Sequence, residues 1–233
     1  MPNILKSLVD KDVLANRGYV LVHGLDTNCA REELLRILGD VANPVAFFDQ
    51  PMIMDVTPLE GAQPTSYAGK GQFDLHTDLT FHDAPPAHMA MFCIAADEVG
   101  GDSVLADGFS VFDSFSLNEQ QMFRESLIPF PQPKHINGGR PVLRPIMSGT
   151  DDIRLLRFRL DMLDLASLPA DIRNLLVEFR KRAEQTMMQF HMQPGELQLV
   201  NNHRMLHGRT AITTIPSKRH LLRAYGSLPM PTA

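Results

Sequence analysis

The shortness of its apolar segments is the feature that most limits what this chain can fold into. The longest of them is HMAMFCIAA, residues 88–96, which is too short to cross a membrane. A near-continuous apolar run of this length is typical of a strand buried on both faces. Short segments at 18–24 and 52–56, and a third after the glycine pair at 100–101, predict further strands. A succession of short strands predicts a mainly β protein.

Three other segments predict helices. Residues 26–41 place leucines on one side, behind Thr27 or Asn28 as the N-cap. A serine and a glutamate at capping-box spacing predict that a second helix begins after Ser116. The longest helix is expected within 168–190, where apolar residues recur along one stripe.

The remaining segments complete the expected architecture. Residues 128–141 are rich in proline and glycine and predict a loop, whereas 153–163 predict a strand. The end of the chain, 195–228, predicts two strands joined by a loop. No repeat or linker is visible, so we expect a single domain over residues 1–233. The simplest fold class is mainly β with helical decoration, arranged as a β-sandwich or jelly roll.

Charge and composition argue against several classes of protein. The net charge of −5 gives no reason to expect nucleic acid as a partner, and no segment predicts a membrane span. Residues 1–14 lack the apolar core of a signal peptide. Cys29 and Cys93 are expected to be small buried residues and not a disulfide. We therefore expect a cytoplasmic globular protein, and the sequence leaves open whether it forms a homo-oligomer.

One stretch, FDLHTDLTFHDAPP at residues 73–86, has the pattern of a metal site. In an extended segment His76 and Asp78 point to the same face, so both can reach one ion. With one more histidine they would form the triad of non-haem Fe(II) oxygenases. The competing interpretation is a structural loop in which the imidazole bonds a carbonyl group and Asp78 caps a turn.

The spacing of histidines along the sequence does not identify the third metal ligand. The histidines that remain as candidates are His135, His191, His203, His207 and His220. Of these, His203 and His207 are expected in a loop between the two late strands, which is a usual place for ligands.

Two longer stretches resemble the taurine-dioxygenase-like Fe(II)/2-oxoglutarate oxygenases. The first is LHTDLTFHDAPPAHMAMFCIAADEVGGDSVLADGF, and the second is FHMQPGELQLVNNHRMLHGRTA followed by RHLLRAY. The double proline, PGE, NNHRMLHGR and the final RHL and AY are most similar to the gamma-butyrobetaine and trimethyllysine hydroxylase branch. The resemblance covers most of residues 18–226. It implies a double-stranded β-helix, or jelly roll, and an enzyme that uses Fe(II), 2-oxoglutarate and O₂.

The resemblance also implies residue roles. The iron ligands of the family match His76, Asp78 and His207. Arg219 and Arg223 match positions that hold the distal carboxylate of 2-oxoglutarate, and the resemblance leaves open which of the two does so. Ser103 matches a position where relatives carry a hydroxyl group near the same cosubstrate.

The expected activity is hydroxylation of an unactivated C–H bond in a small carboxylate- or amino-acid-like metabolite, with release of succinate and CO₂. Asp78 favours hydroxylation, because related halogenases lack this carboxylate. Desaturation or cyclisation by the same chemistry stays open. The competing classes are a metal-dependent hydrolase or isomerase and a non-catalytic jelly-roll binding module.

Four residues are candidates for contact with the substrate. Arg157 and Arg159 would share a face of the strand expected at 153–163, which favours an acidic group on the substrate. Tyr67 and Tyr225 match part of the cage of Tyr and Trp with which the branch holds a trimethylammonium group. The chain has no Trp and three Tyr, and a trimethylammonium group is held by several aromatic faces. We therefore expect a substrate that is not a trimethylammonium compound.

Overall fold

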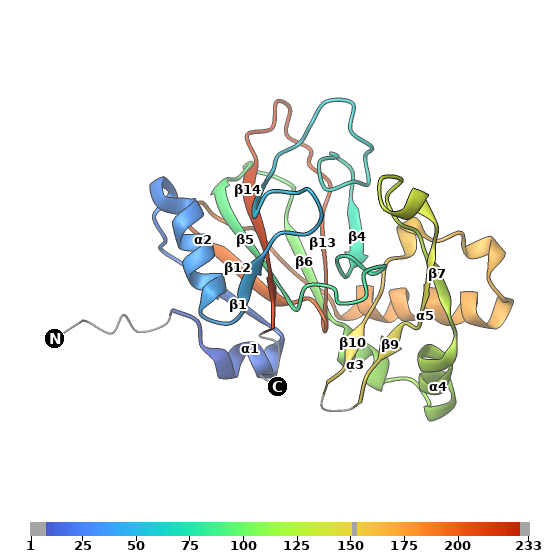
Figure 1. Ribbon diagram of the computed structural model, residues 1–233. Coiled ribbons are helices and arrows are strands. Elements are labelled where there is room, and N and C mark those ends of the chain that lie inside the picture. Colours follow the sequence, from blue (N-terminus) through green and yellow to red (C-terminus); the bar gives the residue numbers. More distant parts are fainter. Residues whose placement is uncertain (1–7, 151–152, 229–233) are drawn as a thin grey trace.

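Two antiparallel sheets pack against each other in the computed structural model, which describes residues 8–150 and 153–228 (Figure 1). The larger sheet has the strand order β1 (Tyr19–Val22), β12 (Leu197–Asn201), β5 (His88–Ala95) and β14 (His220–Ser227), and both β2 (Asn43–Val45) and β3 (Ile53–Val56) pair with β14. The smaller sheet has the order β11 (Met188–Phe190), β6 (Ser103–Asp107), β13 (Met205–Arg209) and β4 (Phe73–His76).

The chain alternates between the two sheets. It passes from β3 in the larger sheet to β4 in the smaller one, back to β5 and again to β6. After a long insertion, β11 lies in the smaller sheet, and β12, β13 and β14 alternate in the same way. This winding is the double-stranded β-helix, so the expected jelly roll is confirmed.

Each strand divides its side chains between an outer and an inner face. In β5, Ala90 and Phe92 pack outward, whereas Met89 lies in the cluster between the sheets. The apolar run at 88–96 is therefore buried on both faces, as its composition predicts. Cys93 is buried and Cys29 is exposed, so the prediction that Cys29 belongs to the core is wrong; both thiols are free.

Helices near the start of the chain cover the outer face of the larger sheet (Figure 1). They are α1 (Lys11–Arg17) and α2 (Ala30–Gly39), which is preceded by a 3₁₀ turn at Thr27–Cys29. The expected cap at Thr27 or Asn28 is wrong, because the Asp26 side chain accepts from the Asn28 N–H at 2.9 Å and starts the turn earlier.

The insertion between β6 and β11 forms a separate layer against the outer face of the smaller sheet. It contains α3 (Gly108–Asp113), α4 (Leu117–Glu125), the pair β7 (Ile128–Phe130) and β8 (Val142–Arg144), the pair β9 (Met147–Ser148) and β10 (Leu155–Leu156), and α5 (Ala170–Thr186). The capping box at Ser116 and Glu119 is confirmed. The core of this layer is aromatic and includes Phe112, Phe123, Phe130, Phe158 and Phe179.

Three predicted elements differ from the structure, and two of them lie in the insertion. Residues 128–141 begin with a short strand, because Ile128 and Phe130 are buried around Pro129 and the segment pairs with β8. The strand expected at 153–163 stops at Leu156, because the next amides are used elsewhere: the Phe158 N–H donates to Thr77 Oγ1 at 3.0 Å.

The end of the chain contains three strands instead of two. His203 lies in the turn after β12, but His207 lies within β13 and not in a loop. Within the described ranges, no helix is both long and apolar enough to span a bilayer.

Candidate metal centre

His76 is the last residue of β4 and faces the space between the sheets because of a bulge. The register between β13 and β4 pairs His207 with His76 and Arg209 with Phe73, so β4 has one extra residue in this interval. A bulge of this kind re-aims side chains, and both Phe73 and His76 line the inner cavity. His76 Nδ1 lies 2.8 Å from Asp74 O and must donate to it, which leaves Nε2 unprotonated and free to bind a metal.

Asp78 follows in a short segment whose backbone is held on two sides. The Thr77 N–H donates to Phe158 O at 2.8 Å, and the Asp78 N–H donates to Asn202 Oδ1 at 2.7 Å. Asn202 also donates from its amide to Asp78 O at 3.2 Å and to Pro86 O at 2.9 Å. The Asp78 side chain caps no turn, and it points toward the two histidines.

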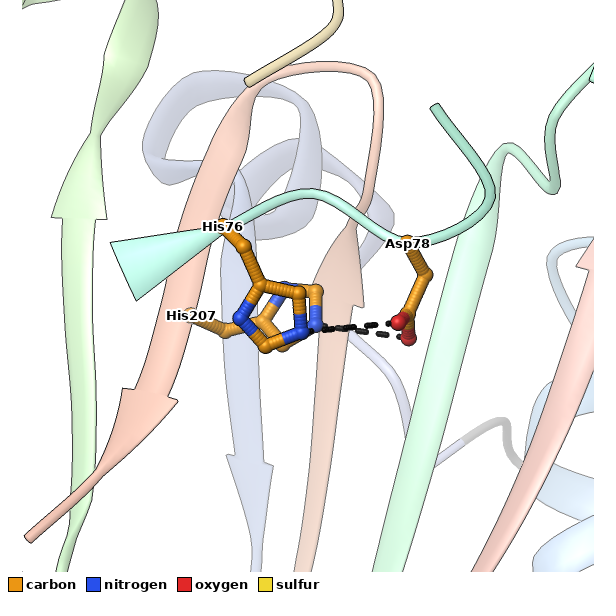
Figure 2. Close-up of side chains that lie close together, drawn as sticks. All are labelled: His76, Asp78 and His207. Carbon is orange, nitrogen blue, oxygen red and sulfur yellow. Dashed lines mark ion pairs between the residues drawn. The ribbon is translucent and has the colours of Figure 1, made fainter. Parts of the chain in front are cut away.

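The structure brings His76, Asp78 and His207 together (Figure 2). His76 Nε2 lies 3.5 Å from Asp78 Oδ1, and His207 Nε2 lies 3.3 Å from Asp78 Oδ2. One ligand atom from each residue falls within 4.8 Å of the others, and all three residues are buried. Two imidazole nitrogens and one carboxylate are the donor set of the 2-His-1-carboxylate triad, so these residues fit a divalent iron ion.

Electrostatics at the triad keep its donors available. Burial, together with the charge of His207, lowers the pKa of His76 to about 4, so its imidazole is neutral at neutral pH. Burial would by itself raise the pKa of Asp78, but the nearby Arg223 guanidinium and the two neighbouring imidazoles hold it well below its usual range. A neutral imidazole and an ionised carboxylate are the forms that bind a metal.

The other candidate histidines are placed elsewhere. His203 Nε2 lies 3.0 Å from Pro85 O, and His191 Nδ1 lies 2.5 Å from Asp102 Oδ1. His220 Nε2 lies 2.7 Å from Asp55 Oδ1, at the edge of the larger sheet. His135 is exposed in the insertion. None of these four joins the described cluster of possible metal ligands.

A cavity beside the triad is lined by three arginines. Arg223, in β14, has its Nη1 3.7 Å from Asp78 Oδ2. Arg219 stands just before β14 and is 7% exposed, and burial followed by the charge of Arg209 lowers its pKa to about 10. It forms no ion pair with any carboxylate in the described part of the chain. Arg209 is the third arginine, and the lining also includes the polar residues Ser103 and Gln198.

The four candidates for substrate contact have different surroundings. Tyr67 lines the cavity, whereas the Tyr225 hydroxyl group donates to Asp78 Oδ2 at 2.9 Å. Arg157 is buried and anchored, since it donates to Ser148 Oγ at 2.9 Å and to Asp83 O at 3.1 Å. Arg159 has its Cζ 5.2 Å from the centre of the Phe73 ring. Because the segment leaves the strand at Leu156, the expectation that the two arginines share a strand face is wrong.

Sequence reasoning missed three polar residues around this centre: Gln198, Asn202 and Arg209. Arg209 had a usable signal, because it stands two residues after His207 and so shares the inner face of β13. Gln198 interrupts an apolar strand, which is a weaker signal. Asn202 offered no signal beyond its place in a turn.

Comparison with known proteins gives a consistent result. Trimethyllysine dioxygenase, mitochondrial, from Gallus gallus is 26% identical over 168 residues, covering 64% of this chain and 39% of that protein. Gamma-butyrobetaine dioxygenase from Pseudomonas sp. (strain AK-1) is 25% identical over 225 residues, covering 89% of this chain and 56% of that protein. The chain thus spans about half the length of the curated relatives it matches.

Solved structures share the fold. An asparagine oxygenase in complex with Fe(II), 2S,3S-3-hydroxyasparagine and succinate superposes with a TM-score of 0.79 at 20% identity, covering 93% of this chain and 78% of that one. The non-heme iron oxygenase OrfP in complex with Fe and alpha-ketoglutaric acid gives a TM-score of 0.75 at 18% identity, covering 94% and 77%. Residues 10–225 match the model of one sequence family, and the chain belongs to that family, the taurine catabolism dioxygenase TauD, TfdA family.

Proposed function

We propose that this chain is an Fe(II)- and 2-oxoglutarate-dependent dioxygenase that hydroxylates a small, carboxylate-bearing or amino-acid-like metabolite. The observation that carries the proposal is the position of the His76, Asp78 and His207 donor set beside a buried cavity lined by three arginines. Iron with 2-oxoglutarate and O₂ supplies the oxidising power, with succinate and CO₂ as the by-products. The relatives that are named as dioxygenases support the same reading.

The arginines divide the work of binding a dicarboxylate. Arg223 lies against Asp78, at the metal end of the cavity, where it can pair with the carboxylate that chelates the metal. Arg219 has no described carboxylate partner, so we assign it to the distal carboxylate of 2-oxoglutarate. Gly101 makes room for it, since a Cβ there would lie 3.0 Å from Arg219 Cδ. Ser103 lines the same region and offers a hydroxyl donor.

The substrate would meet Arg159, whose guanidinium lies over Phe73, a residue of the cavity lining. Phe73 also packs on His76, with the ring centres 4.2 Å apart. The positive charge of Arg159 contributes to the low pKa of His76. The guanidinium makes one described hydrogen bond, to Asp161 Oδ1 at 3.3 Å. Its remaining donors are available for a carboxylate. Arg157 is less suited, because backbone and serine oxygens already occupy it.

We further propose that residues 1–233 act as one oxygenase domain, and that the protein works in the cytoplasm. The family match over most of the chain supports the first proposal, and the two free cysteines support the second. Cell fractionation would test the location.

An anaerobic titration tests the function. Fe(II) is added to the protein, then 2-oxoglutarate, and the visible spectrum is recorded. An oxygenase is expected to show a weak charge-transfer band that needs both additions. A hydrolase, an isomerase or a binding module is expected to show none. The band should disappear in His207→Ala and persist in His203→Ala, which removes a histidine outside the cluster. Under air, mass spectrometry of the substrate distinguishes hydroxylation from desaturation or cyclisation.

A further inference from the structure

Residues 59–72, the cyan loop between β3 and β4 in Figure 1, border the cavity through Tyr67, and we call them the roof loop. The loop folds back on itself, because the Leu59 N–H donates to Ala68 O at 2.9 Å and the Gly69 N–H donates to Ser66 O at 2.9 Å. No residue of the roof loop belongs to a strand, and the Ile212 N–H donates to Lys70 O at 2.8 Å.

Arg209 holds the roof loop from below. Its Nη1 donates to Gly69 O at 2.9 Å and its Nη2 donates to Gly71 O at 2.7 Å, so it grips the backbone on both sides of Lys70. The fold of the loop itself requires glycine here, because a Cβ on Gly69 would lie 2.1 Å from Gln63 O.

The surroundings of Arg209 are unusual for a structural residue. The residue is 5% exposed, and it makes no ion pair with any described carboxylate. A buried guanidinium that is hydrogen-bonded to neutral carbonyl groups and has no carboxylate partner is costly, and a neutral residue would avoid that cost. Arg209 stands two residues after His207, and both line the cavity. The strand that carries a proposed metal ligand thus also holds the roof loop.

Tyr67 links the roof loop to the metal end of the cavity. Its ring centre lies 5.5 Å from Arg223 Cζ, which is a cation–π distance. Arg223 in turn lies 3.7 Å from Asp78. Movement of the roof loop would take the Tyr67 ring away from the arginine that we assign to the chelating carboxylate.

We propose that Arg209 is a positioning residue that fastens the roof loop and so keeps Tyr67 against Arg223 in the cosubstrate cavity. The proposal rests on the proposed function, because a closed, preorganised cavity is useful only if 2-oxoglutarate binds there. The described side-chain hydrogen bonds of Arg209 both go to the roof loop, so it acts through the loop.

Limited proteolysis tests the fastening directly. Trypsin cuts after Lys70, the residue between the two carbonyl groups that Arg209 holds. We expect Arg209→Met to speed this cleavage about tenfold, since the two hydrogen bonds from Arg209 no longer oppose local opening. Arg182→Met is the matched control, because Arg182 donates to Ser114 O and Oγ in the insertion, away from the cavity. It should leave cleavage after Lys70 unchanged.

Calorimetry tests the link to the cosubstrate. Zn(II)-loaded protein is titrated with 2-oxoglutarate for the wild type, Arg209→Met, Tyr67→Ala and the double variant. We expect Arg209→Met to weaken binding about tenfold. The double variant should be little weaker than Arg209→Met, because two residues that act through one contact are non-additive. Thermal unfolding of each variant shows whether the fold is intact.

The possible failures are distinguishable. If the wild type does not bind 2-oxoglutarate, the proposed function fails, and the role of Arg209 in it fails as well. If the wild type binds it and Arg209→Met neither speeds cleavage nor weakens binding, only the positioning role is wrong. Faster cleavage with unchanged affinity, or additive effects in the double variant, would also overturn it.

Discussion

The Tyr225 hydroxyl group donates to the Asp78 oxygen that also faces His207 and Arg223. Burial raises the pKa of Tyr225, so the group stays protonated and remains a donor. One carboxylate oxygen is therefore engaged before any metal arrives, and the rotamer of Asp78 is fixed by its neighbours. Partners of this kind orient the ligands of a metal site and so tune its affinity.

Replacement of Tyr225 by phenylalanine should weaken metal binding by about tenfold to a hundredfold, the usual effect of losing a partner of a metal ligand. The dissociation constant for Co(II), measured by its visible absorption, checks this expectation. Tyr19→Phe is the control, because Tyr19 lies in β1, away from the cavity. Equal affinities in the two variants would show that the Tyr225 hydroxyl group does not position Asp78.

The division of labour between Arg219 and Arg223 predicts a pattern of cosubstrate preference. Arg219→Met should weaken 2-oxoglutarate about thirtyfold or more, because it removes the partner of a carboxylate in a partly dry cavity. It should have little effect on 2-oxopentanoate, which has the same chain length and no distal carboxylate. Arg223→Met should weaken both compounds equally. Calorimetry of both variants with both compounds tests this expectation. If Arg223→Met weakens only 2-oxoglutarate and Arg219→Met weakens both compounds, the two assignments must be exchanged.

A trimethylammonium substrate is disfavoured by the aromatic residues as the structure places them. The rings of Tyr67 and Tyr225 lie 5.5 and 5.0 Å from Arg223 Cζ, so both already face an internal cation. We expect gamma-butyrobetaine and trimethyllysine to bind the Zn(II)- and 2-oxoglutarate-loaded protein with dissociation constants weaker than micromolar. Micromolar binding by calorimetry, with hydroxylation of the iron form under air, would contradict this expectation.

Whether a residue of the site can be predicted from the sequence depends on where in the chain its partners lie. His76 and Asp78 are two positions apart, and the period of a strand alone suggests a shared target. The choice of His207 came from the resemblance, because nothing in local spacing separates it from His203. Arg209 and Asn202 were missed, because the carbonyl groups they hold belong to segments far away in the chain.

Among the elements, the turn between β12 and β13 acts on the metal centre through a single side chain. Asn202 is 1% exposed, and its amide bonds both the N–H and the carbonyl group of Asp78 and also the carbonyl group of Pro86. The turn therefore holds the segment after β4, from which Asp78 projects. The position of this ligand is decided jointly by β4 and by a turn from the other end of the chain.

Asn202→Ala should lower the free energy of unfolding by about 2–4 kcal/mol, because buried backbone groups lose their partners. It should also weaken Co(II) binding, since the Asp78 backbone is released. Asn201→Ala is the matched variant at the end of β12, where one hydrogen bond from the His203 N–H is lost, and should cost about 1 kcal/mol with unchanged metal affinity. Urea unfolding and metal titration measure both effects.

Element by element, sequence patterns succeeded where local chemistry is sufficient. The capping box at Ser116 and the doubly buried strand β5 needed no knowledge of the rest of the fold. The strand expected at 153–163 failed because its backbone bonds are made with Thr77, a residue of the metal segment. In this segment, tertiary hydrogen bonds take the place of the strand-to-strand hydrogen bonds that the apolar pattern predicted.

For the molecule as a whole, the triad joins segments that lie far apart in the sequence. β4 and the segment after it supply His76 and Asp78, and β13 supplies His207. A metal ion at this position would cross-link the early and late strands of the jelly roll. Binding and global stability should therefore be linked.

We expect Zn(II) at a hundred times its dissociation constant to stabilise the fold by about 2.7 kcal/mol, and so to raise the melting temperature by about 5–10 °C. Differential scanning fluorimetry with and without the metal checks this. His76→Ala should lose the shift, and His135→Ala should keep it, because His135 is exposed in the insertion. An equal shift in both variants would place the metal elsewhere.

The alternation of strands between the sheets has a consequence for biosynthesis. Because His207 lies in β13, a ribosome makes the third donor well after His76 and Asp78, and until then the nascent protein holds only two of the three. The complete metal site can form only when β13 has paired with β4 and β6. Contacts between segments so far apart in the chain form slowly, so metal loading is expected to be a late step of folding.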